Sequence, residues 1–407
     1  MQSACETTAL MMKTLDIIGG TYLEECVDPV YRELYGSGLR AAIALSNYST
    51  TINFHTAVGY DFKELLNYKS DLFGFKSHTI DVTETVHFIY EHPLCKPQPV
   101  NVPNAIRLVD LGHLSKVLYY GMIDTDIKVT AEMMVYDPQN QVPFEQSGAI
   151  AKNLALILNK WEALSFLDHP EEDLEKVGKL LMSKENVSVV VIKNGSDGAM
   201  LFEGNKVEKI PLYRTPQVWP IGSGDIFSAV FAFHWMILEQ SAFESAIKAS
   251  ASVAQFCDTK QLQFDSTKTY PEQVIKSKQK KIYLAAPFFT TGERMFLNEV
   301  RYLLQQFGNE VFSPFHDVGT IDGDATNVEI STVVQSDLTG IDQSDLVLAI
   351  YSGTDPGTVF EVGYARAKGI PVVALCENVK EEDLFMLSGS GCEITQDLSS
   401  AIYKASW

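Results

Sequence analysis

The stretch DLVLAIYSGTDPGTVFEVGYARAKGIPVVALCE (residues 345–377) joins two short apolar runs through a glycine-containing turn and an apolar helical segment. The runs DLVLAIYSG and IPVVALCE are typical of buried strands, and the segment between them predicts a helix. A strand, a helix and a second strand in this order favour a parallel sheet. One carboxylate, Glu361, stands inside the predicted helix.

The same alternation runs through most of the chain and predicts an α/β fold. Further buried strands are expected at LDIIGG, MMVYDP, VSVVVIKNG and KIYLAAPFF, and helices at GSGLRAAIALSNY, LEKVGKLLMS, RMFLNEVRYLLQQFG and VVQSDLTGIDQ. The stretch DSTKTYPEQVIKSKQK (265–280) is polar, lysine-rich and without apolar periodicity. It predicts a boundary between two domains, at residues 13–270 and 279–407.

Composition bounds the classes of function. The 407 residues suggest two or three domains, and 46% hydrophobic with 21% charged residues is the profile of a globular protein. A formal net charge of −20 argues against nucleic-acid binding, which depends on Lys and Arg neutralising phosphates. Small molecules are therefore the expected ligands.

The terminus and the cysteines predict the compartment. The opening MQSACETTALMMK lacks the pattern of a signal peptide, and no stretch approaches a membrane span, so a cytoplasmic protein without membrane contact is expected. The six cysteines are scattered without a Cys-x-x-Cys pair. Reduced thiols are expected, with neither a zinc site nor a disulfide framework.

Four side chains are candidates for one site. Ligands of open parallel sheets bind beyond the carboxyl ends of the strands. Tyr283 lies in a predicted strand, Asp355 and Glu361 follow another, and Asp337 stands on the helix leading into it. Structural roles remain open for each: a helix-dipole contact in a first turn for Glu361, a surface position for Asp337, a turn before proline for Asp355 and an inward aromatic for Tyr283.

The segments KIYLAAPFF, SDLTGIDQSDLVLAI and DPGTVFEVGYARAKGIPVV resemble, in order and spacing, three signatures of the nucleoside 2-deoxyribosyltransferase family. The resemblance covers residues 279–407 and implies a smaller flavodoxin- or Rossmann-like domain. It also implies that Glu361 is the nucleophile and Tyr283 orients it. Asp337 and Asp355 would handle the sugar hydroxyl and the leaving base.

This chemistry requires carboxylates and no cofactor. Breaking an N-glycosidic bond builds positive charge at C1′, which a carboxylate stabilises or captures covalently, and a second carboxyl group can protonate the departing base. Gly353 and Gly357 would let the backbone approach the sugar, and Thr358 is expected to cap the helix. The residues expected to bind substrate are Gly357, Thr358, His316 and Asp317.

The loop SPFHDVG (313–319) leaves the substrate open. His316 and Asp317 could contact a base, a sugar or a 5′-phosphate, or could serve the loop structure alone. The substrate could accordingly be a nucleoside, a monophosphate or NAD.

Residues 13–265 resemble the ribokinase-like (PfkB-type) sugar and nucleoside kinases, through LDIIGGTYLEECV, GSGLRAAIALS, AVGYD, NKWE, VIKNGSDG and WPIGSGDIFSAVFAF. The resemblance implies ATP and Mg²⁺ as cofactors. It makes Gly222, Ser223 and Gly224 an anion hole at a helix N-terminus, with Asp225 as the base. Gly195 and Gly198 would also bind the nucleotide, and Asn159 and Glu162 would help hold magnesium.

The departures from that family lie on the acceptor side. Glu24 replaces the usual aspartate, Tyr35 a glycine, Arg40 an asparagine, and Trp219 to Ile221 an Asp-Thr-Thr run. Both an active kinase of unusual specificity and a catalytically weakened binding domain are compatible with this pattern.

Two hypotheses of function follow. The first is a two-domain enzyme of nucleoside metabolism, which cleaves or transfers at N-glycosidic bonds and phosphorylates a related nucleoside or sugar. The second is a sensor-effector protein, in which a degenerate kinase fold binds a nucleotide and gates a nucleotide or NAD glycohydrolase. The transferase resemblance also implies a homo-oligomer, because members of that family often complete the site across subunits.

Overall fold

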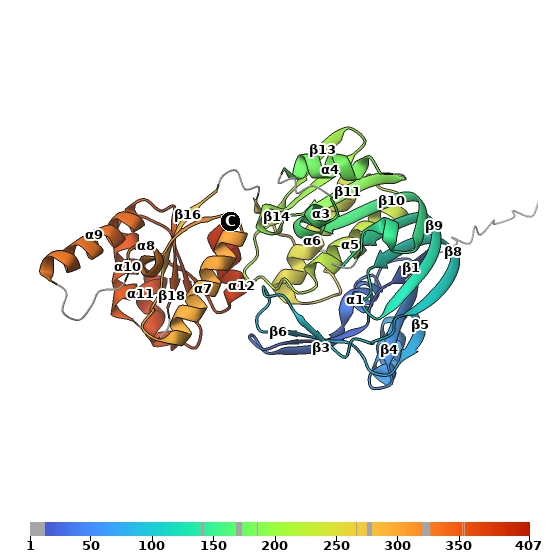
Figure 1. Ribbon diagram of the computed structural model, residues 1–407, viewed down its shortest axis with the longest axis horizontal. Coiled ribbons are helices and arrows are strands. Elements are labelled where there is room, and N and C mark those ends of the chain that lie inside the picture. Colours follow the sequence, from blue (N-terminus) through green and yellow to red (C-terminus); the bar gives the residue numbers. More distant parts are fainter. Residues whose placement is uncertain are drawn as a thin grey trace, which may run out of the picture.

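The computed structural model describes residues 13–407 except for 140–141, 168–172, 185, 266, 275–278, 320–325, 352 and 354. It contains a large N-terminal region (residues 13–274) and a smaller C-terminal region (281–407), each built on its own sheet (Figure 1). Within the described part, no helix combines the length and apolarity that crossing a membrane requires.

The N-terminal region is built on a nine-stranded sheet in the order β13-β12-β11-β10-β9-β8-β1-β4-β5. The strands pair in parallel from β11 to β5, and β12 and β13 are antiparallel at one edge. Their bounds are β1 Thr14–Ile18, β4 Thr51–Gly59, β5 Lys76–Val82, β8 Arg107–Tyr120, β9 Thr125–Asp137, β10 Ala149–Asn159, β11 Val187–Lys193, β12 Ala199–Glu203 and β13 Lys206–Ile210.

Smaller elements complete this region. A second sheet has the order β3-β2-β6-β7, and β14 pairs with β15. These strands are β2 Tyr22–Cys26, β3 Tyr31–Tyr35, β6 His87–Tyr90, β7 Gln98–Val100, β14 Leu212–Tyr213 and β15 Gln273–Val274. The helices are α1 Gly36–Ala44, α2 Lys63–Phe73, η1 Phe144–Gln146, α3 Lys160–Ser165, α4 Leu174–Met182, η2 Gly195–Asp197, α5 Ser223–Ala232, η3 Phe233–Ile237 and α6 Ala242–Thr259.

The C-terminal region has a five-stranded, all-parallel sheet in the order β17-β16-β18-β19-β20. The strands are β16 Lys281–Ala285, β17 Glu310–Phe312, β18 Leu346–Ile350, β19 Val372–Leu375 and β20 Glu393–Thr395. The helices are α7 Thr291–Gln306, α8 Pro314–Asp317, α9 Asn327–Asp342, α10 Pro356–Ala367, η4 Glu381–Leu384, α11 Phe385–Gly389 and α12 Leu398–Ser406.

Two apolar clusters cover the two faces of this smaller sheet. Residues of α7 and α12 pack with one set of strand side chains, and residues of α9 and α10 pack with the other. Every residue of β18 is buried, as expected for a strand covered on both faces. The predicted α/β fold, with a mostly parallel sheet followed by a smaller parallel one, is confirmed.

The expected strands and helices are present, with one correction. The loop predicted at residues 313–319 contains the short helix α8, which begins with Pro314 in its first turn. Proline fits there because a helix leaves its first N–H groups without intrahelical partners.

Helix α12 lies at the junction of the two regions (Figure 1). Its Ala401, Ile402 and Ala405 belong to the C-terminal core, whereas Tyr403 and Trp407 pack in the N-terminal core. Ser399 Oγ donates to Val218 O at 2.7 Å, and Val218 N donates to Ser400 Oγ at 2.9 Å. One helix therefore contributes to the cores of both regions.

Candidate functional site

A hydrogen bond joins the tyrosine of β16 to the carboxylate of α10. Tyr283 in β16 is fully buried, stacks on Phe312 and donates from its hydroxyl to Glu361 Oε1 at 2.7 Å. Glu361 is beyond the first turn of α10, which holds no acidic residue. The helix-dipole interpretation of Glu361 is therefore wrong, because that effect falls off within the first turn.

Two further carboxylates, Asp337 and Asp355, act electrostatically on Glu361. Burial raises the pKa of Glu361 to about 7, the Tyr283 hydrogen bond opposes this, and the charges of Asp337 and Asp355 raise it. Burial, Glu361 and Asp337 also raise the pKa of Tyr283. Tyr283 and Glu361 are thus in direct contact, and the charges of Asp337 and Asp355 act on Glu361.

Asp337 differs from an ordinary surface carboxylate. It is partly buried on α9, and its Oδ1 is enclosed without a hydrogen-bond partner among the described residues. Burial raises its pKa to about 6. A carboxyl group in this state can hold a proton near neutral pH and can bond to a hydroxyl or ring nitrogen of a ligand.

Asp355 has a second task as the N-cap of α10. Its Oδ2 accepts from Thr358 N at 2.7 Å and from Thr358 Oγ1 at 2.9 Å. The expectation that Thr358 caps the helix is thus wrong, since Thr358 supplies the donors. A Cβ at Gly357 would lie 3.1 Å from Asp355 Oδ2, so the glycine leaves room for the cap. Gly353 has a φ of +66°, which favours glycine.

His316 and Asp317, which were predicted to bind the substrate, lie on α8. His316 bonds through Nδ1 to Ser313 Oγ at 3.0 Å and through Nε2 to Asn298 Oδ1 at 2.8 Å. Asp317 Oδ2 accepts from Ser313 N at 2.7 Å. Both side chains thus bond to Ser313, the N-cap of α8, and His316 also bonds to α7. None of these contacts joins the carboxylate cluster.

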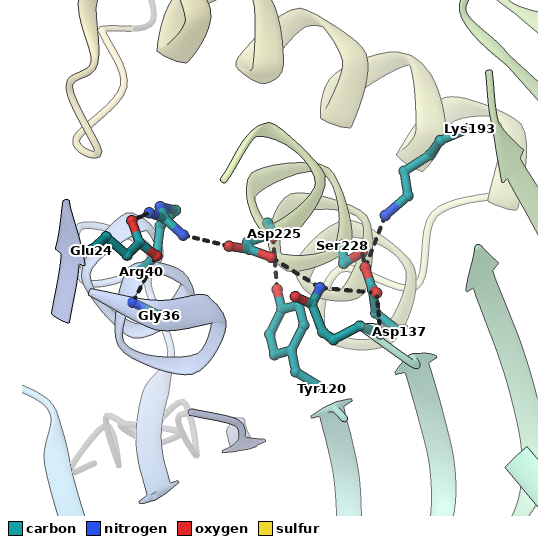
Figure 2. Close-up of polar contacts among 9 residues, drawn as sticks. Glu24, Gly36, Arg40, Tyr120, Asp137, Lys193, Asp225 and Ser228 are labelled. Atoms are coloured by element: carbon teal, nitrogen blue, oxygen red, sulfur yellow. Dashed lines mark hydrogen bonds and ion pairs between the residues drawn. The ribbon is translucent and has the colours of Figure 1, made fainter. Parts of the chain in front are cut away.

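The predicted kinase site of the N-terminal region is dominated by a buried chain of charges (Figure 2). The Arg40 guanidinium binds Glu24 with one nitrogen and Asp225 Oδ2 with another, and all three side chains are buried. Asp225 Oδ1 accepts from Gln139 Nε2 at 3.0 Å. Both oxygens of the predicted base therefore accept hydrogen bonds from protein groups.

Burial and charge set the protonation of this chain. Burial raises the pKa of Asp225 to about 6, while Arg40 lowers it. For Arg40 burial lowers the pKa, but Glu24 and Asp225 raise it well above its ordinary value. Arg40 is thus a permanent cation between two carboxylates. Asp137 is linked to the same chain through Gln139, and it also binds Lys193 and Ser228.

Arg40 also occupies the space beside the predicted anion hole. Gly222 is the N-cap of α5 with a φ of +81°, and a Cβ there would lie 2.2 Å from Arg40 Cζ. Sequence analysis identified Arg40 as a departure from the kinase pattern but missed its pairing with Asp225. The two residues are 185 positions apart, so no local signal could have revealed the pair.

A cavity of about 140 Å³ lies beside the other residues predicted to bind a nucleotide. Gly195, Gly198, Ser223 and Gly224 line it together with Lys193. Its remaining walls are largely apolar and include Val218, Phe227, Tyr403 and Trp407. The last two come from α12 and the residue that follows it, a contribution that sequence analysis missed because no motif marks it.

The predicted magnesium residues have a local structural role. Asn159 and Glu162 form the capping box of α3: Asn159 Oδ1 accepts from Glu162 N at 2.9 Å, and Glu162 Oε2 accepts from Asn159 N at 2.7 Å. Across the described residues, no cluster of three His, Cys, Asp or Glu side chains could hold a metal ion. Magnesium binding at these positions stays a prediction.

Two family models match the chain. Residues 282–395 match the model described as nucleoside 2-deoxyribosyltransferase, and residues 124–268 match that of the pfkB family carbohydrate kinases. Both resemblances found in the sequence are thereby confirmed. A comparison with curated proteins gives no match.

Similar solved structures include ribokinase from Giardia lamblia, with 15% identity, 62% of this chain and 95% of that chain covered, and a TM-score of 0.47. Phosphofructokinase-2 from Escherichia coli in complex with potassium has 11% identity, coverage of 63% and 96%, and a TM-score of 0.46.

Proposed function

We propose, with the two family matches as the premise, that the C-terminal region cleaves or transfers at the N-glycosidic bond of a nucleoside or nucleotide. The hydrogen-bonded pair Glu361–Tyr283, with Asp337 and Asp355 beside it, is the observation that carries the proposal. Retaining glycosidases use a carboxylate in the same way, to capture the sugar at its anomeric carbon.

Each residue has a defined part in this reaction. Ionised Glu361 attacks C1′, the C1′–N bond breaks, and its electron pair leaves with the base. Asp337 in its protonated state donates a hydrogen bond or proton to the departing base or holds a sugar hydroxyl. Water or a second base then takes the sugar from Glu361. Tyr283 holds the nucleophile in position, and Asp355 holds the start of α10.

The test incubates the full chain with nucleosides, deoxynucleosides, their monophosphates and NAD, with and without a second free base. Chromatography then identifies released base or exchanged nucleoside. Glu361→Ala should abolish product formation, and Glu382→Gln, with a side chain that is 72% exposed, is the control. Turnover by Glu361→Ala close to that of the wild type would contradict the proposal. A monophosphate preference that His316→Ala reduces would assign His316 to the 5′-phosphate.

For the N-terminal region, the Arg40–Asp225 pair favours the sensor-effector hypothesis over phosphoryl transfer. A base must accept the proton of the attacking hydroxyl, and here that hydroxyl would compete with the Arg40 cation at Oδ2 of Asp225 and with Gln139 Nε2 at Oδ1. The cavity beside these residues is where a nucleotide would bind. ATP would supply an aromatic base and an anionic phosphate chain, which Gly195, Gly198, Ser223, Gly224 and Lys193 would hold.

A transfer assay with γ-labelled ATP, magnesium and a panel of nucleosides and sugars tests this assignment. The wild-type chain should give no labelled product. Labelled product that Asp225→Ala removes would restore the kinase hypothesis. Arg40→Asn restores the asparagine that is usual in the family. This variant tests whether Asp225 and the predicted anion hole can support phosphoryl transfer once the Arg40 cation is removed.

A further inference from the structure

The cavity in the N-terminal region is incomplete without the C-terminal region. Tyr403 and Trp407 form part of its wall, although both belong to the segment that ends the smaller domain. The Tyr403 ring is 4.9 Å from Phe307, at the end of α7, and 6.1 Å from the Trp407 ring. An occupant of the cavity would therefore touch both regions.

Trp407, a residue of this wall, has an unused hydrogen-bond donor. It is 8% exposed, and its indole Nε1 is enclosed without an acceptor anywhere in the described part of the chain. A buried donor without an acceptor is unfavourable. A ligand that places an acceptor atom beside this N–H would remove that penalty, whereas a purely apolar ligand would not.

The dimensions and polarity of the cavity define the class of ligand. Its volume of about 140 Å³ is close to that of a cavity known to hold one benzene ring. Ser223 and Gly224 at the N-terminus of α5, with Lys193, line it as well, and this N-terminus favours negative charge. Together these walls suit a flat ring that carries an acceptor and is attached to an anionic chain.

We propose that Tyr403 and Trp407 complete a composite site for a nucleotide, and that its occupancy changes the activity of the Glu361 site through α12. The composite site is independent of the chemistry at Glu361, whereas its effect on turnover rests on the function proposed above. The kinase-like region would thus bind a regulatory nucleotide, and α12 would be the element that both regions share.

The contacts of α12 supply the physical connection. Ser399 and Ser400 bond to Val218, a cavity residue a few positions before Gly222. On its other side α12 packs against β18 and β19, the strands against which α10 also packs. Ligand contacts that favour one position of α12 would therefore bias the strands beside Glu361, and coupling requires only that the ligand binds the two positions unequally.

Calorimetry on the full chain tests the composite site, with ATP in the presence of EDTA as the probe. Trp407→Ala should weaken ATP binding at least tenfold, and Trp407→Phe, which keeps a ring and removes the N–H, should weaken it less. Trp161→Ala is the matched control, because Trp161 is 58% exposed outside the cavity. Inorganic triphosphate, which lacks a ring, should bind weakly and equally to all four proteins.

Two outcomes would overturn the composite site: the wild-type chain does not bind ATP, or neither Trp407 variant changes the affinity for ATP. Trp407→Phe preserves most of the packing, so it keeps the test valid if Trp407→Ala fails to fold.

Hydrogen exchange tests the coupling without relying on turnover. Saturating ATP should change the exchange of amides in α10 (356–367) in the wild type and in Trp161→Ala, and to a smaller extent in Trp407→Phe. Glycosidic turnover should shift in parallel where a substrate has been found. If ATP binds and α10 does not respond, the coupling is refuted. If α10 responds and no N-glycoside is cleaved, the proposed reaction fails and the composite site stands.

Discussion

At the scale of single residues, Glu361 is subject to opposing demands. A nucleophile must be ionised, yet burial raises the pKa of this carboxyl to about 7. Only the Tyr283 hydroxyl, among the groups that shift it, favours the ionised form. The site therefore holds a carboxylate that is poorly solvated and correspondingly reactive, at a cost in stability above neutral pH.

Replacement of Glu361 by Gln should show this cost. Between the ordinary pKa of 4.5 and about 7, the folded state binds more protons than the unfolded state, so stability falls as the pH rises. At pH 8 the variant should be more stable than the wild type by about 1–3 kcal/mol, and at pH 4 the two should be equal. Thermal unfolding at both pH values checks this, and an equal or lower stability at pH 8 would contradict it.

Replacement of Tyr283 by Phe should move the pH dependence of catalysis. In the wild type, kcat/KM should pass through a maximum near pH 6–7, because Glu361 acts ionised and Asp337 acts protonated. Loss of the hydroxyl removes the hydrogen bond that lowers the pKa of Glu361, so the midpoint that Glu361 sets should shift to higher pH. A merely structural role for Tyr283 would reduce the rate at every pH and leave the midpoint unchanged.

Replacement of Arg40 by Met should destabilise the N-terminal region strongly. Glu24 and Asp225 would remain buried without their shared cation, and breaking such a pair costs about 3–5 kcal/mol. Lys152→Met, which breaks an ion pair between exposed side chains, is the control and should change little. Denaturant unfolding, followed by the fluorescence of buried Trp219, measures the loss of stability in each variant. Equal losses in both variants would contradict the expected contribution of Arg40 to stability.

At the scale of elements, the start of α10 depends on Asp355. Asp355→Ala should lose the cap, cost about 1 kcal/mol and displace Glu361, so kcat should fall. Asp355→Asn retains a capping oxygen and should restore both the exchange protection of the first turn and most of the activity. If Asn fails to restore the activity while protection returns, Asp355 acts through its charge.

The sequence predicted the elements well, because burial patterns decide them locally. The run LVLAI of β18 is buried at every position, and DPGTVFEVGYA forms α10 directly after it. The Tyr283–Glu361 pair was implied by the resemblance to the nucleoside 2-deoxyribosyltransferase family, and the structure contains this hydrogen bond. The cap of α10 was misassigned to Thr358, since both Asp355 and Thr358 are good capping residues and only the backbone geometry distinguishes them.

At the scale of the whole molecule, the sequence could not predict which surfaces meet. Sequence analysis assigned no element to residues 398–407, and their division between two cores depends on the orientation of complete regions. The same is true of Arg40, whose partner Asp225 arrives from the far end of the N-terminal region. Long-range pairs of this kind leave no trace in local periodicity.

Sharing α12 should make the two regions unfold together. Ile402→Ala removes buried side-chain volume from the C-terminal core, which typically costs about 2–5 kcal/mol. The change should lower the unfolding temperature reported by Trp219, which is buried in the N-terminal core. A separate, unshifted Trp219 transition would show that the regions unfold independently.

Because α12 contributes to the cores of both regions, it also constrains how the sequence can evolve. Two regions that share no core can diverge independently, but here a substitution among the N-terminal residues that pack on Trp407 must suit the helix that the C-terminal region supplies. Relatives that carry both regions should therefore show correlated substitutions at positions 218, 403 and 407. Relatives in which either region occurs alone should have lost that correlation, and in them position 407 should be free to vary.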